Sequence, residues 1–263
     1  MRHSPVPIAL TIAGSDSGGG SGIQADLKTF AALGVHGTTV LTCITAQNPK
    51  GVRGVQPAST KILRQQLAAV FGELSPAAVK TGMLYSSSLI RAVAAFLGRG
   101  SCPLIVDPVM ISTSGAPLLK PSAVEVLRKE LLPLATLVTP NLDEAEVLTG
   151  ARLRSVEDLR AAARELRRLF GCAALVKGGH LRGMKEAVDI FYDGKQELLL
   201  SAPFVRGVKT HGTGCTYSAA ITAQMARGFS LPQAVASAKQ FVTQAIASSR
   251  TVRRHTVLDW RPL

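Results

Sequence analysis

Residues 8–33 are IALTIAGSDSGGGSGIQADLKTFAAL, and this stretch decides the fold. Its first residues are almost all apolar, which predicts a buried strand that ends near Gly14. A run of glycine and serine follows, and apolar residues then return at helical spacing from Ile23 to Leu33. A strand, a glycine-rich loop and a helix in this order are typical of a parallel sheet covered by helices.

The rest of the chain repeats this alternation. We expect further strands at 38–45, 77–82, 103–109, 136–141 and 173–179, and helices at 60–74, 87–97, 122–131, 143–148, 156–170, 212–227 and 232–249. Residues 187–203 predict a β-hairpin that turns at Asp193 and Gly194. No linker divides the chain, so we expect one α/β domain over residues 1–263. Its mostly parallel central sheet would have helices on both faces and an antiparallel hairpin at the edge.

Composition excludes several classes of protein. Of the 263 residues, 46% are hydrophobic and 18% charged, which is typical of a compact globular chain. The net charge of +13 is also a feature of nucleic-acid binders, but the basic residues are spread along the sequence. The densest run, RAAARELRR at 160–168, predicts a solvated helix face with Leu159, Leu166 and Leu169 on the buried side. We therefore expect no nucleic-acid partner.

Cysteine spacing and hydropathy indicate the compartment. The four cysteines lie far apart, which argues against a zinc site and fits reduced thiols in the cytoplasm. No apolar run approaches the ~18 residues of a membrane span, and the N-terminal stretch does not resemble a signal peptide. A cytoplasmic protein without a membrane partner is expected.

Polar residues end each predicted strand. In parallel sheets, ligands bind beyond the carboxyl ends of the strands, so these residues are candidates for a binding site. They are Gly14-Ser15-Asp16, Thr45 to Asn48, Lys80-Thr81-Gly82, Asp107-Pro108, Pro140-Asn141 and Lys177-Gly178-Gly179. The sequence therefore predicts a cleft along this edge of the sheet.

Two glycine-rich segments are candidate anion sites. The first, residues 14–22, would let a ligand approach the backbone at a helix N-terminus, although a tight turn is the alternative. It matches neither the dinucleotide-binding pattern nor the P-loop. The second, Gly212-Thr213-Gly214-Cys215, begins a helix whose N–H groups would meet at one point and bind phosphoryl oxygens. Cys215 would lie at the positive end of that helix, where thiols lose their proton more easily; a buried structural cysteine is the alternative.

A third group combines carboxylates with a lysine. Phosphoryl transfer needs a divalent ion, usually Mg²⁺, bound through few carboxylates, and a cation near the transferred phosphate. Glu144 and Asp107 are candidates for the metal, and Lys177 is the candidate cation. The alternative is helix capping by Asn141 and Asp143 and a surface position for Glu144.

Taken in order, these motifs resemble the hydroxymethylpyrimidine and phosphomethylpyrimidine kinases of thiamine biosynthesis, within the ribokinase-like superfamily. The resemblance runs from AGSDSGGGSGIQADLKTF through HGTTVLTCITAQN, VKTGML, VDPVM, TPNLDEAEVL and VKGGH to HGTGCTYSAAI. It implies a ribokinase-like fold and phosphorylation, by ATP with Mg²⁺, of 4-amino-5-hydroxymethyl-2-methylpyrimidine and then of its monophosphate. It also implies a homodimer.

The resemblance assigns a substrate pocket. It implies that Gln47 hydrogen-bonds the aminopyrimidine, which suits an amide because that group offers both a donor and an acceptor. It also implies that Gly14, Asp26, Met83 and Val109 help to shape the pocket.

The resemblance also assigns the phosphate chemistry. Cys215 would assist deprotonation of the hydroxymethyl group, while residues 212–214 would bind phosphate through backbone amides. Lys177 would neutralise the nucleotide phosphates. The N-x-x-E pattern of Asn141 and Glu144 is linked with magnesium in this superfamily, and Asp107 would assist. Lys239 is a candidate for the adenine pocket.

Two other functions compete with this one. Most ribokinase-like sugar kinases carry Asp where this chain has Cys215, and this difference argues against a sugar substrate. Some relatives with a cysteine there accept pyridoxal, pyridoxine or pyridoxamine, so a vitamin B6 kinase is one alternative. The other is a noncatalytic nucleotide or vitamin sensor, because one fold can host many functions.

Overall fold

The computed structural model describes residues 5–98, 100, 102–110, 118–119, 121–179, 181, 183–205, 208 and 211–261. A nine-stranded sheet with the order β3-β2-β1-β4-β5-β6-β7-β8-β9 organises this part of the chain. Its strands are β1 (Ile8–Asp16), β2 (His36–Asn48), β3 (Gly51–Pro57), β4 (Ala78–Thr81), β5 (Leu104–Val106), β6 (Leu137–Val138), β7 (Ala173–Lys177), β8 (Glu186–Tyr192) and β9 (Glu197–Pro203). A sheet that is continuous from β3 to β9 is what we expect of one domain.

Parallel pairing holds the middle of the sheet. The neighbours from β2 through β1, β4, β5 and β6 to β7 pair in parallel, whereas β3, β8 and β9 pair antiparallel. All carboxyl ends of the parallel strands therefore meet at one edge, where the sequence predicts the cleft.

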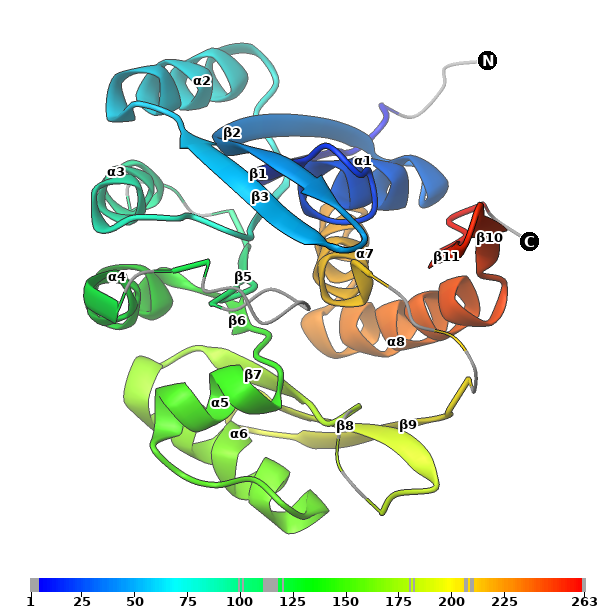
Figure 1. The fold of residues 1–263 in the computed structure, drawn as a ribbon. Coiled ribbons are helices and arrows are strands. Elements are labelled where there is room, and N and C mark those ends of the chain that lie inside the picture. Colours follow the sequence, from blue (N-terminus) through cyan, green and yellow to red (C-terminus); the bar gives the residue numbers. More distant parts are fainter. Residues whose placement is uncertain are drawn as a thin grey trace.

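In the described part of the chain, eight α-helices cover the two faces of the sheet (Figure 1). They are α1 (Gly22–Ala32), α2 (Thr60–Glu73), α3 (Ser87–Leu97), α4 (Pro121–Val126), α5 (Leu142–Thr149), α6 (Val156–Phe170), α7 (Thr213–Ala226) and α8 (Leu231–Ala247). One apolar core joins the sheet to α2 through α6, and two smaller cores join the other face to α1, α7 and α8. The predicted fold class is confirmed.

Helix α6 illustrates how local sequence makes an element. Ser155 and Asp158 form a capping box at its start, and Gly171 ends it in the left-handed region with φ of 73°. Leu159 and Leu166 are fully buried, as expected. The expectation for Leu169 is wrong, because its side chain is 37% exposed and Phe170 takes the buried position at the end of this face.

The sequence predicted the hairpin at one edge of the sheet but not strand β3 at the other edge. The hairpin of β8 and β9 lies where it was predicted, and its turn forms as the Asp193 carboxylate accepts the backbone N–H groups of Lys195 and Gln196. Strand β3 was not predicted, because GVRGVQP contains two glycines, an arginine and a proline. Such a segment forms a strand only as an edge paired to β2.

Three smaller differences lie outside the main sheet. The helix expected at 122–131 changes to π-helical hydrogen bonding over Leu127–Leu131, and a 3₁₀ turn, Leu132–Leu134, follows. A short hairpin of β10 (Arg250–Val252) and β11 (His255–Val257) closes the described chain.

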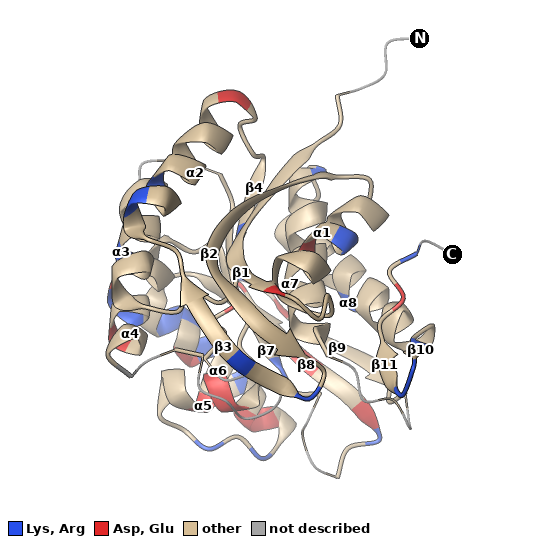
Figure 2. Cartoon of the chain, turned by 45° about the horizontal axis from the view of Figure 1, so that its top comes forward, with Lys and Arg blue, Asp and Glu red and all other residues tan. Residues whose placement is uncertain are grey.

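Lys and Arg are distributed over several helices and strands in Figure 2, including α2, β3 and the segment after α8. Among the described residues, no helix combines the length and apolarity needed to cross a membrane.

Candidate active site

A cavity of about 630 Å³ lies at the carboxyl ends of the parallel strands. Thirteen of the predicted site residues line it: Gly14, Gln47, Met83, Asp107, Val109, Asn141, Glu144, Lys177, Gly212, Thr213, Gly214, Cys215 and Lys239. The fold thus brings together residues that are up to 225 positions apart in sequence, from Gly14 to Lys239. We call the region of Thr45, Gln47 and Met83 the amide end of the cavity, and the region of Asp107, Glu144 and Lys177 the charged end.

Asp16 organises the glycine-rich loop between β1 and α1. Its carboxylate accepts the backbone N–H groups of Gly18, Gly20 and Ser21 at 2.8, 3.1 and 2.8 Å. Burial alone would raise the pKa of Asp16, but hydrogen bonds from His211 and these loop groups hold it well below its usual range. The loop was expected to offer its backbone to a ligand anion. Three of its N–H groups instead bind an internal carboxylate, so this expectation is wrong for them.

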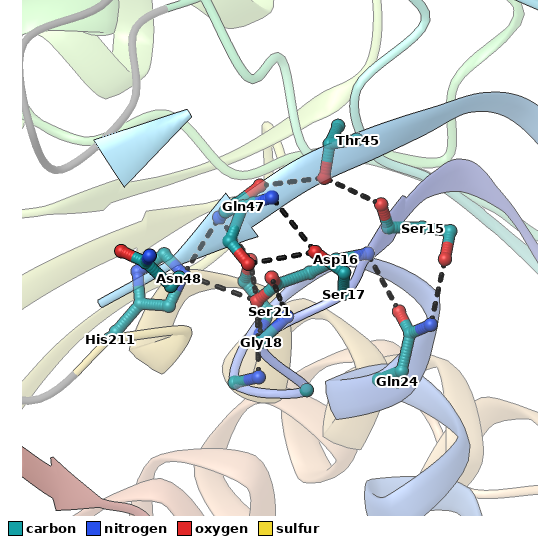
Figure 3. A network of polar contacts seen from close by, with 12 residues as sticks. Ser15, Asp16, Ser17, Gly18, Ser21, Gln24, Thr45, Gln47, Asn48 and His211 are labelled. Carbon is teal, nitrogen blue, oxygen red and sulfur yellow. Dashed lines mark hydrogen bonds and ion pairs between the residues drawn. The ribbon is translucent and has the colours of Figure 1, made fainter. Parts of the chain in front are cut away.

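Polar side chains around Gln47 form one side of the amide end (Figure 3), and an apolar wall that includes Met83 forms the other. The hydroxyl of Thr45 lies 3.1 Å from Gln47 Oε1, and Met83 Sδ lies 3.9 Å from Cys43 Sγ. Gly14 belongs to the same wall, because a Cβ there would lie 2.6 Å from Cys43 Sγ. The arrangement fits a flat ring that has both an apolar face and a polar edge.

Lys177 and Asp107 form the centre of the charged end. Lys177 Nζ lies 3.1 Å from Asp107 Oδ1, and Ser218 donates its hydroxyl to Asp107 Oδ2 at 3.1 Å. Burial alone would lower the pKa of Lys177, but the carboxylates of Asp107 and Glu144 outweigh it and the pKa lies above its ordinary value. Lys177 is therefore a permanent cation whose side chain keeps 14% of its surface exposed.

Glu144 and Asn141 form a capping box at the start of α5. Asn141 Oδ1 accepts the Glu144 N–H, and Glu144 Oε2 accepts the Asn141 N–H, both at 3.0 Å. The capping alternative is thus confirmed for Asn141, while Asp143 is exposed in the first turn and is not the cap. The surface alternative for Glu144 is wrong, since it is only 4% exposed. Burial raises the pKa of Glu144, and Lys177 only partly offsets this.

The start of α7 lies directly against the glycine-rich loop. Gly212 has φ of 86°, and a Cβ there would overlap the carbonyl oxygen of Gly20. A Cβ at Gly214 would lie 3.4 Å from Lys177 Nζ and 3.9 Å from Asp107 Oδ2. Glycine at these positions therefore permits the close approach of two backbones and leaves space beside the charged end.

Cys215 differs from its expectation. A thiol at a helix N-terminus was predicted to have a lowered pKa. Burial instead raises the pKa of Cys215 to about 11, and the charge on Lys80 only partly offsets this. The reason is that desolvation of the thiolate outweighs the attraction of nearby positive charge. Cys215 is therefore a neutral thiol near pH 7.

Asp26 lies behind the cavity and not in its lining. It forms a fully buried ion pair with Lys80, and Thr11 donates its hydroxyl to Asp26 Oδ2 at 2.7 Å. Lys80 does line the cavity, and its Nζ is 3.4 Å from the carbonyl oxygen of Cys215. Asp26 can thus act on a ligand through Lys80, and its direct contact with a pyrimidine stays a prediction.

Lys239 lies on α8 and contacts β8, which is six strands away from the β2 strand of Gln47 in the sheet. It binds Asp189 Oδ2 at 2.7 Å and the Ala187 carbonyl oxygen at 3.0 Å, which ties α8 to β8. Asp189 Oδ1 also accepts the N–H of Gly178, the residue after Lys177. Lys239 therefore helps to fix the end of β7, while its contact with an adenine base stays a prediction.

Sequence reasoning assigned no role to three residues of this site. In the sequence, Asp16 and Lys80 stand out only as polar residues at strand ends, and His211 only as the residue before Gly212. A signal existed for the first two, because an acid before a glycine run favours a turn and a lysine inside an apolar strand needs a buried partner. His211 carried no such signal, since its partners Asp16 and Gln47 are about 160 or more residues away.

The charged end is suited to a magnesium ion that arrives with a nucleotide. Among the described residues, no cluster of three or more His, Cys, Asp or Glu side chains forms a metal cage. Mg²⁺ does not require one, because it is commonly bound by one or two carboxylates together with phosphate oxygens and water. Asp107 and Glu144 supply two carboxylates beside a lysine, and Gly214 leaves room next to them.

Solved structures place this fold in a class of small-molecule kinases. Pyridoxal kinase of Bacillus subtilis, solved as an ADP complex, has a TM-score of 0.88 and 38% identity, covering 97% of this chain and 98% of its own. Pyridoxal kinase of Staphylococcus aureus, solved with AMP-PCP and pyridoxal, has a TM-score of 0.89 and 35% identity over 98% and 94% of the two chains. The fold is ribokinase-like, and the protein is a phosphotransferase.

Sequence comparison then identifies the family. The profile of the phosphomethylpyrimidine kinase family matches residues 16–258. Hydroxymethylpyrimidine/phosphomethylpyrimidine kinases of Rhizobium meliloti and Streptomyces coelicolor are 50% and 49% identical, each over 92% of this chain and 91% and 89% of their own. A phosphomethylpyrimidine kinase structure from Clostridium difficile has a TM-score of 0.81 and 45% identity, covering 91% of this chain and 99% of its own. The chain belongs to the phosphomethylpyrimidine kinase family.

Proposed function

We propose that this protein phosphorylates 4-amino-5-hydroxymethyl-2-methylpyrimidine and then its monophosphate with ATP, in thiamine biosynthesis. The observation that carries this assignment is the identity of about 50% to kinases of that name over about nine-tenths of both chains. The cavity supports it, because a neutral end suited to a ring and a charged end suited to phosphates lie in one space.

The ring binds at the amide end in this proposal. Gln47 hydrogen-bonds its polar edge, while Gly14, Met83 and Val109 contact its apolar surface. This position directs the hydroxymethyl group toward the start of α7. The fold already positions the residues that bind the ring. The entropic cost of bringing the two substrates together is therefore lower.

The phosphates bind at the charged end. Lys177 neutralises the transferred group, and the N–H groups at the start of α7, residues 213–215, donate to its oxygens as negative charge redistributes. A Mg²⁺ ion held here would supply positive charge that offsets the negative charge of the nucleotide phosphates. Asp107 and Glu144 would bind that ion, and Asn141 supports it by fixing Glu144 through the capping box.

Cys215 accepts the hydroxymethyl proton in this proposal. Its pKa of about 11 means that only a small fraction is thiolate at neutral pH. A small thiolate fraction is compatible with this role, because positioning and charge stabilisation supply most of the catalysis in phosphoryl transfer. After the first transfer, the monophosphate returns to the same site and its phosphate oxygen takes the place of the hydroxyl as the attacking group.

Three finer statements complete the proposal. ADP and AMP-PCP complexes of the related pyridoxal kinases support ATP as the donor. The family resemblance supports a cytoplasmic location and a homodimer. Sedimentation of the purified protein tests the last, and a monomer at micromolar concentration would contradict it.

The test is a coupled assay of ADP release with Mg²⁺ and ATP, with hydroxymethylpyrimidine, its monophosphate and pyridoxal as acceptors. We expect turnover of both pyrimidines. Turnover of pyridoxal alone would instead support the second candidate, a vitamin B6 kinase, which the TM-scores of 0.88 and 0.89 to pyridoxal kinases favour. Binding without any turnover would indicate a sensor.

A further inference from the structure

A ring of hydrogen bonds fixes Gln47 at the amide end. Ser17 donates its hydroxyl to the Gln47 carbonyl oxygen at 2.7 Å and accepts the Gln47 N–H at 2.8 Å, so the backbone is clamped in both directions. The side-chain amide lies among Thr45, Ser21 and His211 (Figure 3). The two ends of an amide have nearly the same shape, so the hydrogen bonds of these neighbours decide which end holds oxygen and which holds nitrogen.

The Thr45 hydroxyl favours the amide nitrogen on its side. Thr45 Oγ1 lies 2.7 Å from the Ser15 carbonyl oxygen and 3.1 Å from Gln47 Oε1. A hydroxyl has one hydrogen, and the shorter contact is with Ser15, whose carbonyl can only accept. The oxygen of Thr45 can then accept a hydrogen bond, and only the amide nitrogen of Gln47 can donate it.

The neighbours on the other side favour the amide oxygen there. His211 Nε2 lies 3.0 Å from the Gln47 amide and 3.3 Å from Asp16 Oδ2. A carboxylate at this distance favours a proton on Nε2, and a protonated Nε2 can donate to an amide oxygen but cannot accept from an amide nitrogen. This orientation gives up one long hydrogen bond, of 3.3 Å, from the Gln47 amide to Ser21 Oγ. Ser21 cannot donate to the amide oxygen instead, because its hydroxyl hydrogen is donated to Asp16 at 3.0 Å.

We propose that His211, supported by Asp16, is a specificity-determining positioning residue that sets the orientation of the Gln47 amide. The single Nε2 hydrogen of His211 lies between Asp16 Oδ2 at 3.3 Å and the Gln47 amide at 3.0 Å, and these two acceptors share it. The Gln47 nitrogen then donates to Thr45. This inference rests on the proposed function, because it concerns how Gln47 recognises the aminopyrimidine.

The orientation determines what Gln47 offers to a ligand. In the proposed state, one amide hydrogen binds Thr45 and one lone pair binds His211, so one donor and one acceptor remain. In the reverse state, Ser21 and His211 take both amide hydrogens and no donor remains. An aminopyrimidine edge carries an amino donor beside a ring-nitrogen acceptor, so only the proposed state can pair with both.

The test is a thermodynamic cycle in which one protein residue and one ligand group are each changed, alone and together. The dissociation constant of every pair is measured by calorimetry. The ligands are 4-amino-5-hydroxymethyl-2-methylpyrimidine and its analogue without the 4-amino group. We expect loss of the amino group to weaken binding to the wild type by about 10- to 100-fold, because the Gln47 oxygen loses its partner. In His211→Leu we expect loss of the 4-amino group to change the dissociation constant only slightly. The matched control is His36→Leu, an exposed histidine at the other end of β2 that should behave as the wild type.

Conservative variants separate hydrogen bonding from folding. The amide of His211→Gln reaches near the position of Nε2, and that of His211→Asn does not. We expect the Gln variant to retain the preference for the amino group and the Asn variant to lose it. In turnover assays of the Asn variant, KM for the pyrimidine should rise while kcat changes less.

An equal preference for the amino group in the wild type, His211→Leu and His211→Asn would overturn the inference. Absence of turnover by the wild type would instead overturn the proposed function, and the calorimetric cycle would still decide the orientation of Gln47. Failure of the wild type to bind the aminopyrimidine would overturn both.

Discussion

The two ends of the cavity are built on different physical principles. The amide end contains neutral donors and acceptors, and their arrangement depends on which group holds each hydrogen. The charged end contains a buried lysine that forms an ion pair with Asp107, and neighbouring carboxylates keep this lysine charged by raising its pKa. In the proposed function, discrimination between rings depends mainly on the amide end, and stabilisation of the transferred phosphate mainly on the charged end. Relatives named for pyrimidine and for pyridoxal kinase activity share this fold, so we expect the amide end to differ between the two groups.

The largest expected effect tests the charged end. Lys177→Met should lower kcat by about 10²- to 10³-fold with little change in acceptor KM, because it removes a cation at the transferred group and leaves Asp107 without its ion-pair partner. Steady-state kinetics on purified protein provides the measurement. Lys195→Met, in the exposed hairpin turn, is the matched control. A Lys177 variant as active as this control would remove the lysine from the reaction.

Cys215 gives the next largest effect. Cys215→Ala should reduce kcat by about 10²-fold and leave substrate affinity nearly unchanged, as for loss of a general base. Because the pKa of Cys215 lies at about 11, the thiolate fraction increases as pH rises toward that value. The kcat/KM of the wild type should therefore increase between about pH 7 and about pH 9, while that of Cys215→Ser stays flat. Equal profiles would show that Cys215 is not the base. Cys102→Ala serves as the control for loss of a thiol.

Gly212 lies where the two ends meet, so its substitution should change both KM and kcat. In Gly212→Ala, the new methyl group would overlap the Gly20 carbonyl and displace the glycine-rich loop from α7. We expect kcat/KM to fall by some tens of fold, because small displacements of positioning groups are costly. Gly228→Ala is the matched control: its φ of 88° is nearly the same, and no atom lies within 4 Å of its Cβ. Similar losses in both variants would mean that backbone strain, and not the loop contact, is responsible.

The smallest effect tests the amide end. Gln47→Leu should raise KM for the pyrimidine by about tenfold, because the polar edge of the ring loses its partners, while kcat changes less. KM for pyridoxal should rise less in the same variant, which would show that Gln47 acts on the choice of ring. A KM equal to that of the wild type would place the ring elsewhere in the cavity.

Much of the fold was predictable because its signals are local. The strands and helices of the sheet follow from apolar runs and helical spacing, and the hairpin after β7 follows from Asp193 and Gly194. Strand β3 was missed because its own residues do not favour a strand, and Leu169 is exposed because Phe170 takes the buried position at the end of α6. In both cases packing, and not propensity, decided the outcome.

The candidate site divides in the same way. The sequence by itself determined the residue types and their order, because ordered motifs and strand ends are local features that the topology of a parallel sheet brings to one edge. Only the tertiary structure decided that Asp26 lies behind Lys80, that Asp16 binds the loop, that burial keeps Cys215 protonated, and that His211 reaches Gln47. The reason is physical: desolvation and hydrogen bonding depend on neighbours that are distant in sequence, and chain order alone does not specify them.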